Sequence, residues 1–88
     1  MTLANKTAVI TGASRGIGAT TARHFAKQGA NVVLIARSAG QIQAIADEIT
    51  AAGGKALALS CDVAAWEELR DAMTQAEAQF GPVDILIN

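Results

Sequence analysis

The sequence TGASRGIG, residues 11–18, lies between a strand pattern and a helix pattern, and the rest of the chain is organised around it. It follows the apolar run TAVI, residues 7–10, which is typical of a short buried strand, and it leads into a helical pattern at residues 17–28. A glycine-rich turn at this junction lets the backbone come close to an anion, and the helix N-terminus adds free N–H groups. The alternative is a loop that only turns the chain. The strand before it, the helix after it and the second strand that follows favour phosphate binding.

Each glycine of this turn has its own expected role. Gly12 allows the sharp exit from the strand, Gly16 leaves room beside a pyrophosphate, and Gly18 lets the helix pack closely on the strand. Ser14 either donates a hydrogen bond to a cofactor phosphate or stabilises the turn. Ile17, at the start of the helix, belongs to the same predicted binding site.

The length, composition and charge of the chain limit the classes of protein to which it can belong. The 88 residues fit one small domain, and an apolar content of 51% excludes disorder. A net charge of −1 without a basic block argues against nucleic acid as the main partner. The single cysteine, Cys61, excludes an internal disulfide and a structural zinc site, so we expect no metal and a reduced, cytoplasmic setting. We also expect no signal peptide and no membrane span.

Strands and helices alternate along the rest of the chain. We expect strands at 6–11, 31–36, 55–60 and 83–87, and helices at 17–28, 39–52 and 65–80. In the first helix, Ile17 is expected to share one apolar side with Ala22 and Phe25. Ser38 is expected to cap the second helix, and Trp66 to pack at the start of the third.

This alternation predicts an α/β fold: a partial doubly wound Rossmann fold, with a parallel four-stranded sheet in the order 3-2-1-4 and three helices. The first two helices would cover one face and the third the other. The switch point, between the first and fourth strands, then lies where the glycine turn opens. The fourth strand would form an unprotected apolar edge, so we expect a longer domain that continues beyond it.

Residues 11–18 resemble the cofactor loop of the short-chain dehydrogenase/reductase family, in the spacing T-G-x-x-x-G-x-G. The resemblance continues at Arg37 after the second strand, at CDV (61–63) after the third, and at DILIN (84–88). It implies an oxidoreductase that transfers a hydride between a nicotinamide cofactor and a carbonyl or alcohol carbon. The family's catalytic serine, tyrosine and lysine cannot be placed here, since the chain has no tyrosine. We therefore expect residues 1–88 to be an N-terminal cofactor-binding half that is cut after its fourth strand and does not turn over alone.

The residues after the second strand bear on the choice of cofactor. Family members that use NAD usually carry an acidic residue where this chain has Ala36, and Arg37 follows directly. Arginine donates paired, charge-assisted hydrogen bonds to phosphate oxygens, and Arg15 in the glycine turn can reach the same group. We therefore predict NADP(H) over NAD(H); the alternative is that Arg37 is an ordinary solvated loop charge.

Three further site residues follow from the resemblance. Asp62 would accept a hydrogen bond from the adenine amino group, and the backbone of Val63 would lie against the ring; alternatively, Asp62 is a plain turn residue. Asn88 matches the first residue of an Asn-Asn-Ala-Gly motif, and would bridge strands and help position the cofactor.

Two other functions stay open. One is a stand-alone nucleotide-binding or regulatory module without catalysis, which completes its sheet with another chain. The other is a different Rossmann-type binder such as a methyltransferase, which usually carries an acid after the second strand that Ala36-Arg37 does not provide. For the full-length enzyme we expect a small carbonyl or alcohol substrate, no nucleic acid or membrane partner, and a homo-oligomer.

Overall fold

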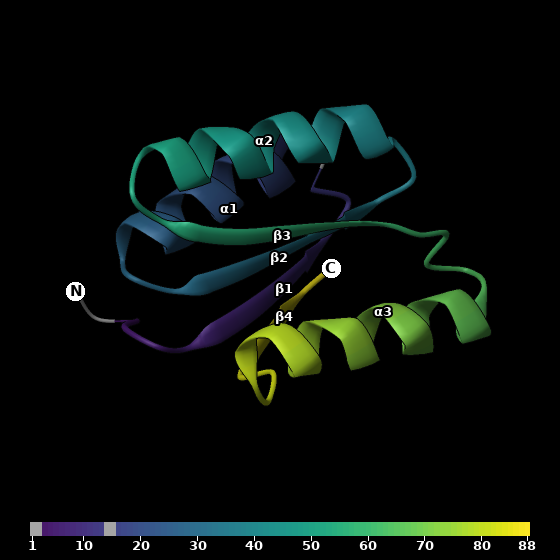
Figure 1. Cartoon of the computed structure of the whole chain (residues 1–88). Coiled ribbons are helices and arrows are strands. Elements are labelled where there is room, and N and C mark those ends of the chain that lie inside the picture. Colours follow the sequence, from purple (N-terminus) through teal and green to yellow (C-terminus); the bar gives the residue numbers. More distant parts are fainter. Residues whose placement is uncertain (1–2, 14–15) are drawn as a thin grey trace.

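The structure, a computed structural model, describes residues 3–13 and 16–88. Within them, four strands and three helices alternate (Figure 1). In chain order they are β1 (Thr7–Thr11), α1 (Gly16–Lys27), β2 (Asn31–Ala36), α2 (Ala39–Ala51), β3 (Lys55–Ser60), α3 (Trp66–Phe80) and β4 (Ile85–Ile87).

All strand pairs of the sheet are parallel, and the order is β3-β2-β1-β4. The predicted order 3-2-1-4 is therefore confirmed. In register, Thr11 lies opposite Ile35, and Ala36 lies opposite Ser60. The carboxyl ends of β1, β2 and β3 consequently finish side by side, and the segments that follow them lie along one edge.

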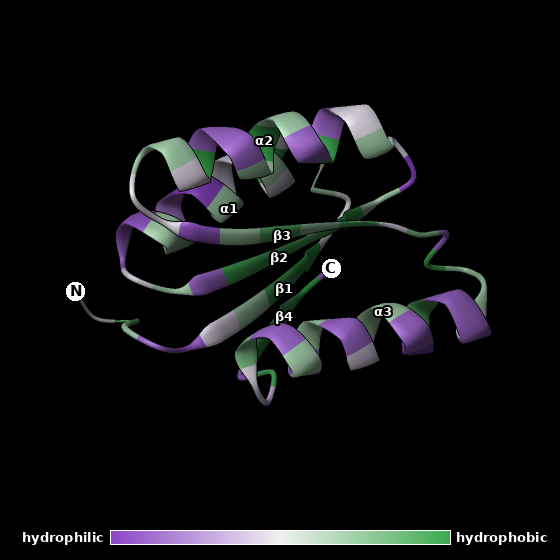
Figure 2. Cartoon of the chain, in the orientation of Figure 1, coloured by the Kyte–Doolittle hydropathy of each residue, from purple (hydrophilic) through white to green (hydrophobic). Residues whose placement is uncertain are grey.

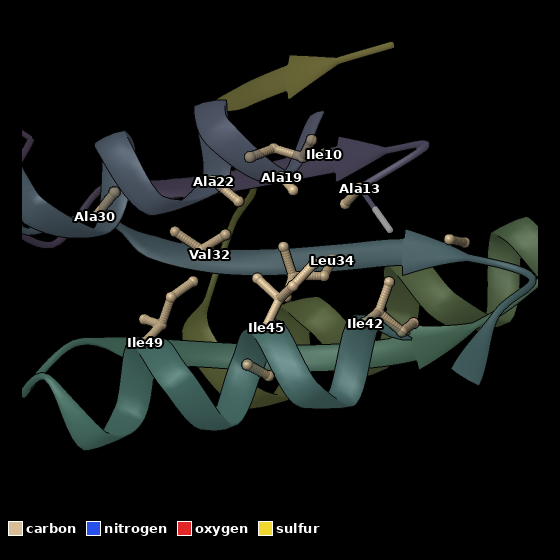
Figure 3. Close-up of a cluster of buried hydrophobic side chains, with 12 residues drawn as sticks. Ile10, Ala13, Ala19, Ala22, Ala30, Val32, Leu34, Ile42, Ile45 and Ile49 are labelled. Carbon is tan, nitrogen blue, oxygen red and sulfur yellow. The ribbon is translucent and has the colours of Figure 1, made fainter. Parts of the chain in front are cut away.

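Helices cover both faces of the sheet, with α1 and α2 on one face and α3 on the other (Figure 1). Successive residues of a strand point to opposite faces. Ile10, Val32 and Leu34 pack under α1 and α2 with the isoleucines of α2 (Figure 3), whereas Val9 and Val33 face α3. Because both faces are covered, the inner residues of the central strands are apolar without alternation, and polar residues band the helices instead (Figure 2).

Two strands begin later than predicted. β1 begins at Thr7 rather than at residue 6, and β4 begins at Ile85 rather than at residue 83. Asp84 precedes β4 and holds the start of β1: its Oδ2 accepts the Thr7 N–H at 2.9 Å, and its own N–H donates to the Thr7 carbonyl at 2.9 Å. The Asp84 carboxylate therefore accepts the Thr7 N–H, which the backbone of a neighbouring strand would otherwise accept.

Three predicted side-chain positions are wrong. Ile17 is 86% exposed, because the buried stripe of α1 runs through Ala19 and Ala22 instead. Trp66 is 70% exposed and belongs to neither core cluster, although helical spacing places it on the same stripe of α3 as Leu69 and Met73, which pack against the core. Ser38 precedes α2 but makes no side-chain cap.

The strand at one edge of the sheet, β4, is apolar, as predicted. It pairs with β1, and its middle residue, Leu86, is 55% exposed. Among the described residues, no helix combines the length and the apolar character that crossing a bilayer requires.

Candidate functional site

The candidate site lies along the carboxyl ends of the parallel strands. The glycine turn follows β1, Arg37 follows β2, and Asp62 follows β3. Backbone hydrogen bonds continue the sheet past the strand ends: Ala13 N–H donates to the Ile35 carbonyl at 3.4 Å, and Cys61 N–H donates to the Ala36 carbonyl at 3.0 Å. The fold thus brings together segments that are about 25 residues apart in sequence, at the edge where open parallel sheets bind ligands.

The glycine turn has the backbone that close approach to an anion requires. Gly12 and Gly16 have φ angles of 63° and 64°, and a Cβ added to either would meet only open space. These φ values are strained for other residues, so glycine is needed here for its conformation. The predicted residues Ser14 and Arg15 lie outside the described residues. Ile17 is exposed at the start of α1 beside the turn.

Gly18 has a packing role instead. A Cβ on Gly18 would overlap the carbonyl oxygen of Gly12 and lie 3.1 Å from the Cα of Ala13. Both atoms belong to the backbone of the turn, so neither can rotate away. Gly18 therefore lets α1 rest directly on the turn that follows β1, which directs the helix N-terminus toward that edge of the sheet.

Arg37 follows Ala36 at the end of β2, and its guanidinium is held by one carboxylate. Its Nη2 lies 2.9 Å from Oδ2 of Asp62, and the arginine side chain is 76% exposed. The Ser60 hydroxyl donates to the Arg37 carbonyl at 3.1 Å and fixes its backbone. The structure therefore pairs two residues that the sequence assigned to different parts of a cofactor.

Asp62 is held from three directions. Its Oδ1 accepts the Ala64 N–H at 3.0 Å, its Oδ2 accepts from Arg37, and its own N–H donates to Oε1 of Glu68 at 3.2 Å. The hydrogen bond from the Ala64 backbone, followed by that from Arg37, lowers the pKa of the Asp62 carboxyl below its ordinary value. The carboxylate is thus ionised and oriented toward Arg37 at neutral pH.

The neighbours of Asp62 differ in exposure. Val63 is 46% exposed. Cys61 is buried, and burial, followed by the charges of Glu68 and Asp62, raises the pKa of its thiol. This environment makes the Cys61 thiol a poor nucleophile, since only the thiolate is a good nucleophile.

Asn88 follows β4, and its side chain lies beside Thr11 at the end of β1. The Thr11 hydroxyl lies 3.4 Å from Oδ1 of Asn88 and 3.3 Å from the Ile87 carbonyl oxygen, and either can accept its proton. This contact joins the edge strand to the residue that immediately precedes the glycine turn.

Sequence reasoning missed three residues that support this site: Thr11, Ser60 and Glu68. Glu68, the third residue of α3, accepts the N–H of Asp62, which lies six residues earlier rather than at the three-residue spacing of a capping box. Thr11 and Ser60 act through partners on neighbouring strands, which only the sheet register identifies.

A hollow also lies between α1 and α2, beside the glycine turn. Residues of both helices line it, among them Ile17, Thr20 and Gln41. Gly16 of the turn also lines this hollow, but the other lining residues belong to the two helices, and neither Arg37 nor Asp62 lines it. We therefore place the candidate site at the strand ends and not in this hollow.

Known proteins are similar to this chain in both sequence and fold. The family model described as short chain dehydrogenase matches residues 6–88. A short chain dehydrogenase of Pseudocercospora fijiensis is 44% identical over 98% of this chain, and the bovine (Bos taurus) hydroxysteroid dehydrogenase-like protein 2 is 47% identical over 98%. The chain spans only 28% and 22% of the length of these two relatives.

Solved structures agree with the sequence relatives. A metagenomic short-chain oxidoreductase in complex with NADP superposes with a TM-score of 0.91 at 42% identity, over 98% of this chain and 39% of that one. A hydroxysteroid dehydrogenase from Escherichia coli gives a TM-score of 0.92 at 42% identity, over 96% of this chain and 36% of that one. Together with the match over residues 6–88, these similarities show that the chain belongs to the short-chain dehydrogenase family.

Proposed function

We propose that this chain is the NADP(H)-binding part of a short-chain dehydrogenase/reductase, which transfers a hydride between the nicotinamide and a carbonyl or alcohol carbon. One observation carries the proposal: the glycine turn and Arg37 lie at the carboxyl ends of adjacent strands, with alanine rather than an acid at residue 36. When bound, the cofactor supplies the redox chemistry. The residues of this chain bind and orient its adenosine and phosphate groups.

The residues present fit such a group. Gly12 and Gly16 leave open space in a left-handed turn, and Gly18 brings the N-terminus of α1 against that turn. This arrangement suits a pyrophosphate, because it combines unobstructed backbone with the positive end of a helix. Arg37 offers an exposed guanidinium beside the end of β2, where the fold family holds the adenosine ribose. The NADP complex of a structural neighbour supports the same assignment.

The chemistry belongs to residues that this chain does not contain. The sequence has no tyrosine, so the family's general acid/base has no counterpart among its 88 residues. We propose that the full-length protein supplies this group together with the pocket for a small carbonyl or alcohol substrate. Homo-oligomer formation and a cytoplasmic location are parts of the same proposal.

A nucleotide-binding module without catalysis is the second candidate. The observation that favours it is the apolar edge strand β4, at which Leu86 is 55% exposed and a strand of another chain can pair. Carbonyl reduction by the full-length protein, measured with NADPH, separates the two. Turnover supports the enzyme, whereas cofactor binding without turnover on a broad set of carbonyl compounds supports the module.

The choice of cofactor is tested with fragments that contact only these strand ends. We expect 2′,5′-ADP, which carries the 2′-phosphate, to bind more tightly than 5′-AMP in calorimetric titrations. Arg37→Gln should weaken the binding of 2′,5′-ADP by about tenfold to a hundredfold, because hydrogen bonds to charged groups contribute about 1.5–3 kcal/mol. The affinity for 5′-AMP should stay nearly unchanged.

Arg23→Gln is the matched control. Arg23 also forms an exposed ion pair, with Glu48 at 2.6 Å, but it joins α1 to α2 away from the strand ends. Both fragments should bind this variant as they bind the parent. Equal affinity of the parent for the two fragments, or an equal loss for both in Arg37→Gln, would contradict NADP(H) selection by Arg37.

A further inference from the structure

We propose that Asp62 is a specificity-determining residue that competes with the cofactor 2′-phosphate for Arg37 and so weakens the preference for NADP(H) over NAD(H). The inference rests on the proposed function, because it concerns the same guanidinium. The chain has no acid at the end of β2, where NAD-type members of the family carry one. In this chain the carboxylate of Asp62, after the neighbouring strand β3, contacts Arg37 after β2.

Of the two partners, Asp62 is the fixed one. The Ala64 N–H holds its Oδ1 at 3.0 Å, and Glu68 holds its backbone N–H at 3.2 Å. Its side chain is 36% exposed, against 76% for Arg37. The carboxylate therefore keeps its place, and the guanidinium must adjust when a second anion arrives.

The position of the pair makes the competition direct. Asp62 Oδ2 takes one N–H of Arg37 Nη2 at 2.9 Å, and this contact neutralises the guanidinium locally. A phosphate is bound best by two parallel N–H groups of the guanidinium fork, so it must share or displace the N–H that Asp62 holds. The phosphate also carries the same sign of charge as Asp62, and like charges at this range repel.

The comparison of two cofactors separates this effect from any contact with adenine. Adenine is common to NAD and NADP, so a lost adenine contact weakens both equally. The ratio of their dissociation constants then reports only what Asp62 does to the 2′-phosphate. Asp62→Asn removes the charge and keeps the shape, and Asp62→Ser keeps an oxygen that can accept the Ala64 N–H.

The experiment measures NADP⁺ and NAD⁺ dissociation constants by calorimetry in the full-length protein that carries this chain. In Asp62→Asn and in Asp62→Ser, the preference for NADP⁺ should rise about threefold to tenfold, the range expected for release of an exposed ion pair and removal of a like charge. In the Arg37→Gln background the same substitutions should change the preference much less. Glu48→Gln, which removes a carboxylate from the other exposed ion pair, should leave it unchanged.

The outcomes separate a failure of the Asp62 competition from a failure of the proposed function. An unchanged or reduced preference in both Asp62 variants, with the parent preferring NADP⁺ and Arg37→Gln losing that preference, overturns the competition alone. An equal rise in the Arg37→Gln background overturns it too, because Asp62 would then act independently of Arg37. If the parent binds NADP⁺ and NAD⁺ equally well, and Arg37→Gln does not change their ratio of dissociation constants, the proposed function is overturned instead. Unchanged far-ultraviolet circular dichroism confirms that each variant is folded.

Discussion

Replacing Gly18 by alanine is expected to destabilise the protein by forcing α1 away from the turn after β1. The added Cβ would overlap the Gly12 carbonyl oxygen and lie 3.1 Å from the Ala13 Cα, and both are backbone atoms. Overpacking of this kind costs about 1–3 kcal/mol. The better helix propensity of alanine returns up to about 1 kcal/mol, so we expect a net loss of roughly 1–2 kcal/mol.

Urea unfolding followed by circular dichroism measures this loss. With a slope of about 1 kcal/mol per M, the unfolding midpoint should fall by roughly 1–2 M. Gly40→Ala is the matched control: Gly40 also lies in the first turn of a helix, α2, and an added Cβ would meet nothing within 4 Å. That variant should be as stable as the parent or slightly more stable. A Gly18→Ala midpoint at or above that of the parent would refute the packing argument.

Three further predictions concern the core and the cysteine. Ile42→Ala should lower the free energy of unfolding by about 3 kcal/mol, because Ile42 is fully buried. Ile17→Ala, at a position that is 86% exposed, should change it by less than about 0.5 kcal/mol. Equal losses for the two variants in urea titrations would contradict the assigned core. At pH 8, Cys61 should react with iodoacetamide more than about tenfold slower in the folded protein than in urea, because burial raises its thiol pKa; equal rates would contradict its burial. As the pH rises above the ordinary thiol value of 9.0, the unfolded chain ionises first, so the unfolding midpoint should fall.

The sequence was sufficient to predict the architecture because the signals for the central strands are strong. The inner residues of TAVIT (β1) and NVVLIA (β2) are apolar without alternation, which is typical of strands covered on both faces, and each strand leads to a helix through a short connection. The right-handed crossover rule and the position of the glycine turn then give the order 3-2-1-4. The buried isoleucine stripe of α2 follows from helical periodicity alone.

What the sequence could not give depends on contacts between distant segments. A single turn of helix does not determine its direction relative to a sheet, so Ile17 and Trp66 were placed in the interior although both are exposed. The Arg37–Asp62 pair depends on the register of β2 against β3, which brings residues 25 positions apart within hydrogen-bond distance. The interpretation of each residue by itself therefore missed their interaction.

Mapping the binding of 2′,5′-ADP by backbone amide chemical shifts shows whether the cofactor binds at the strand ends. We predict the largest changes at Gly12, Gly16, Gly18, Arg37 and Val63, the residues along the carboxyl ends of β1, β2 and β3. With 5′-AMP the changes at Arg37 should shrink, while those at the glycine turn should remain. Changes confined to the hollow between α1 and α2, at Thr20 and Gln41, would contradict a cofactor site at the strand ends.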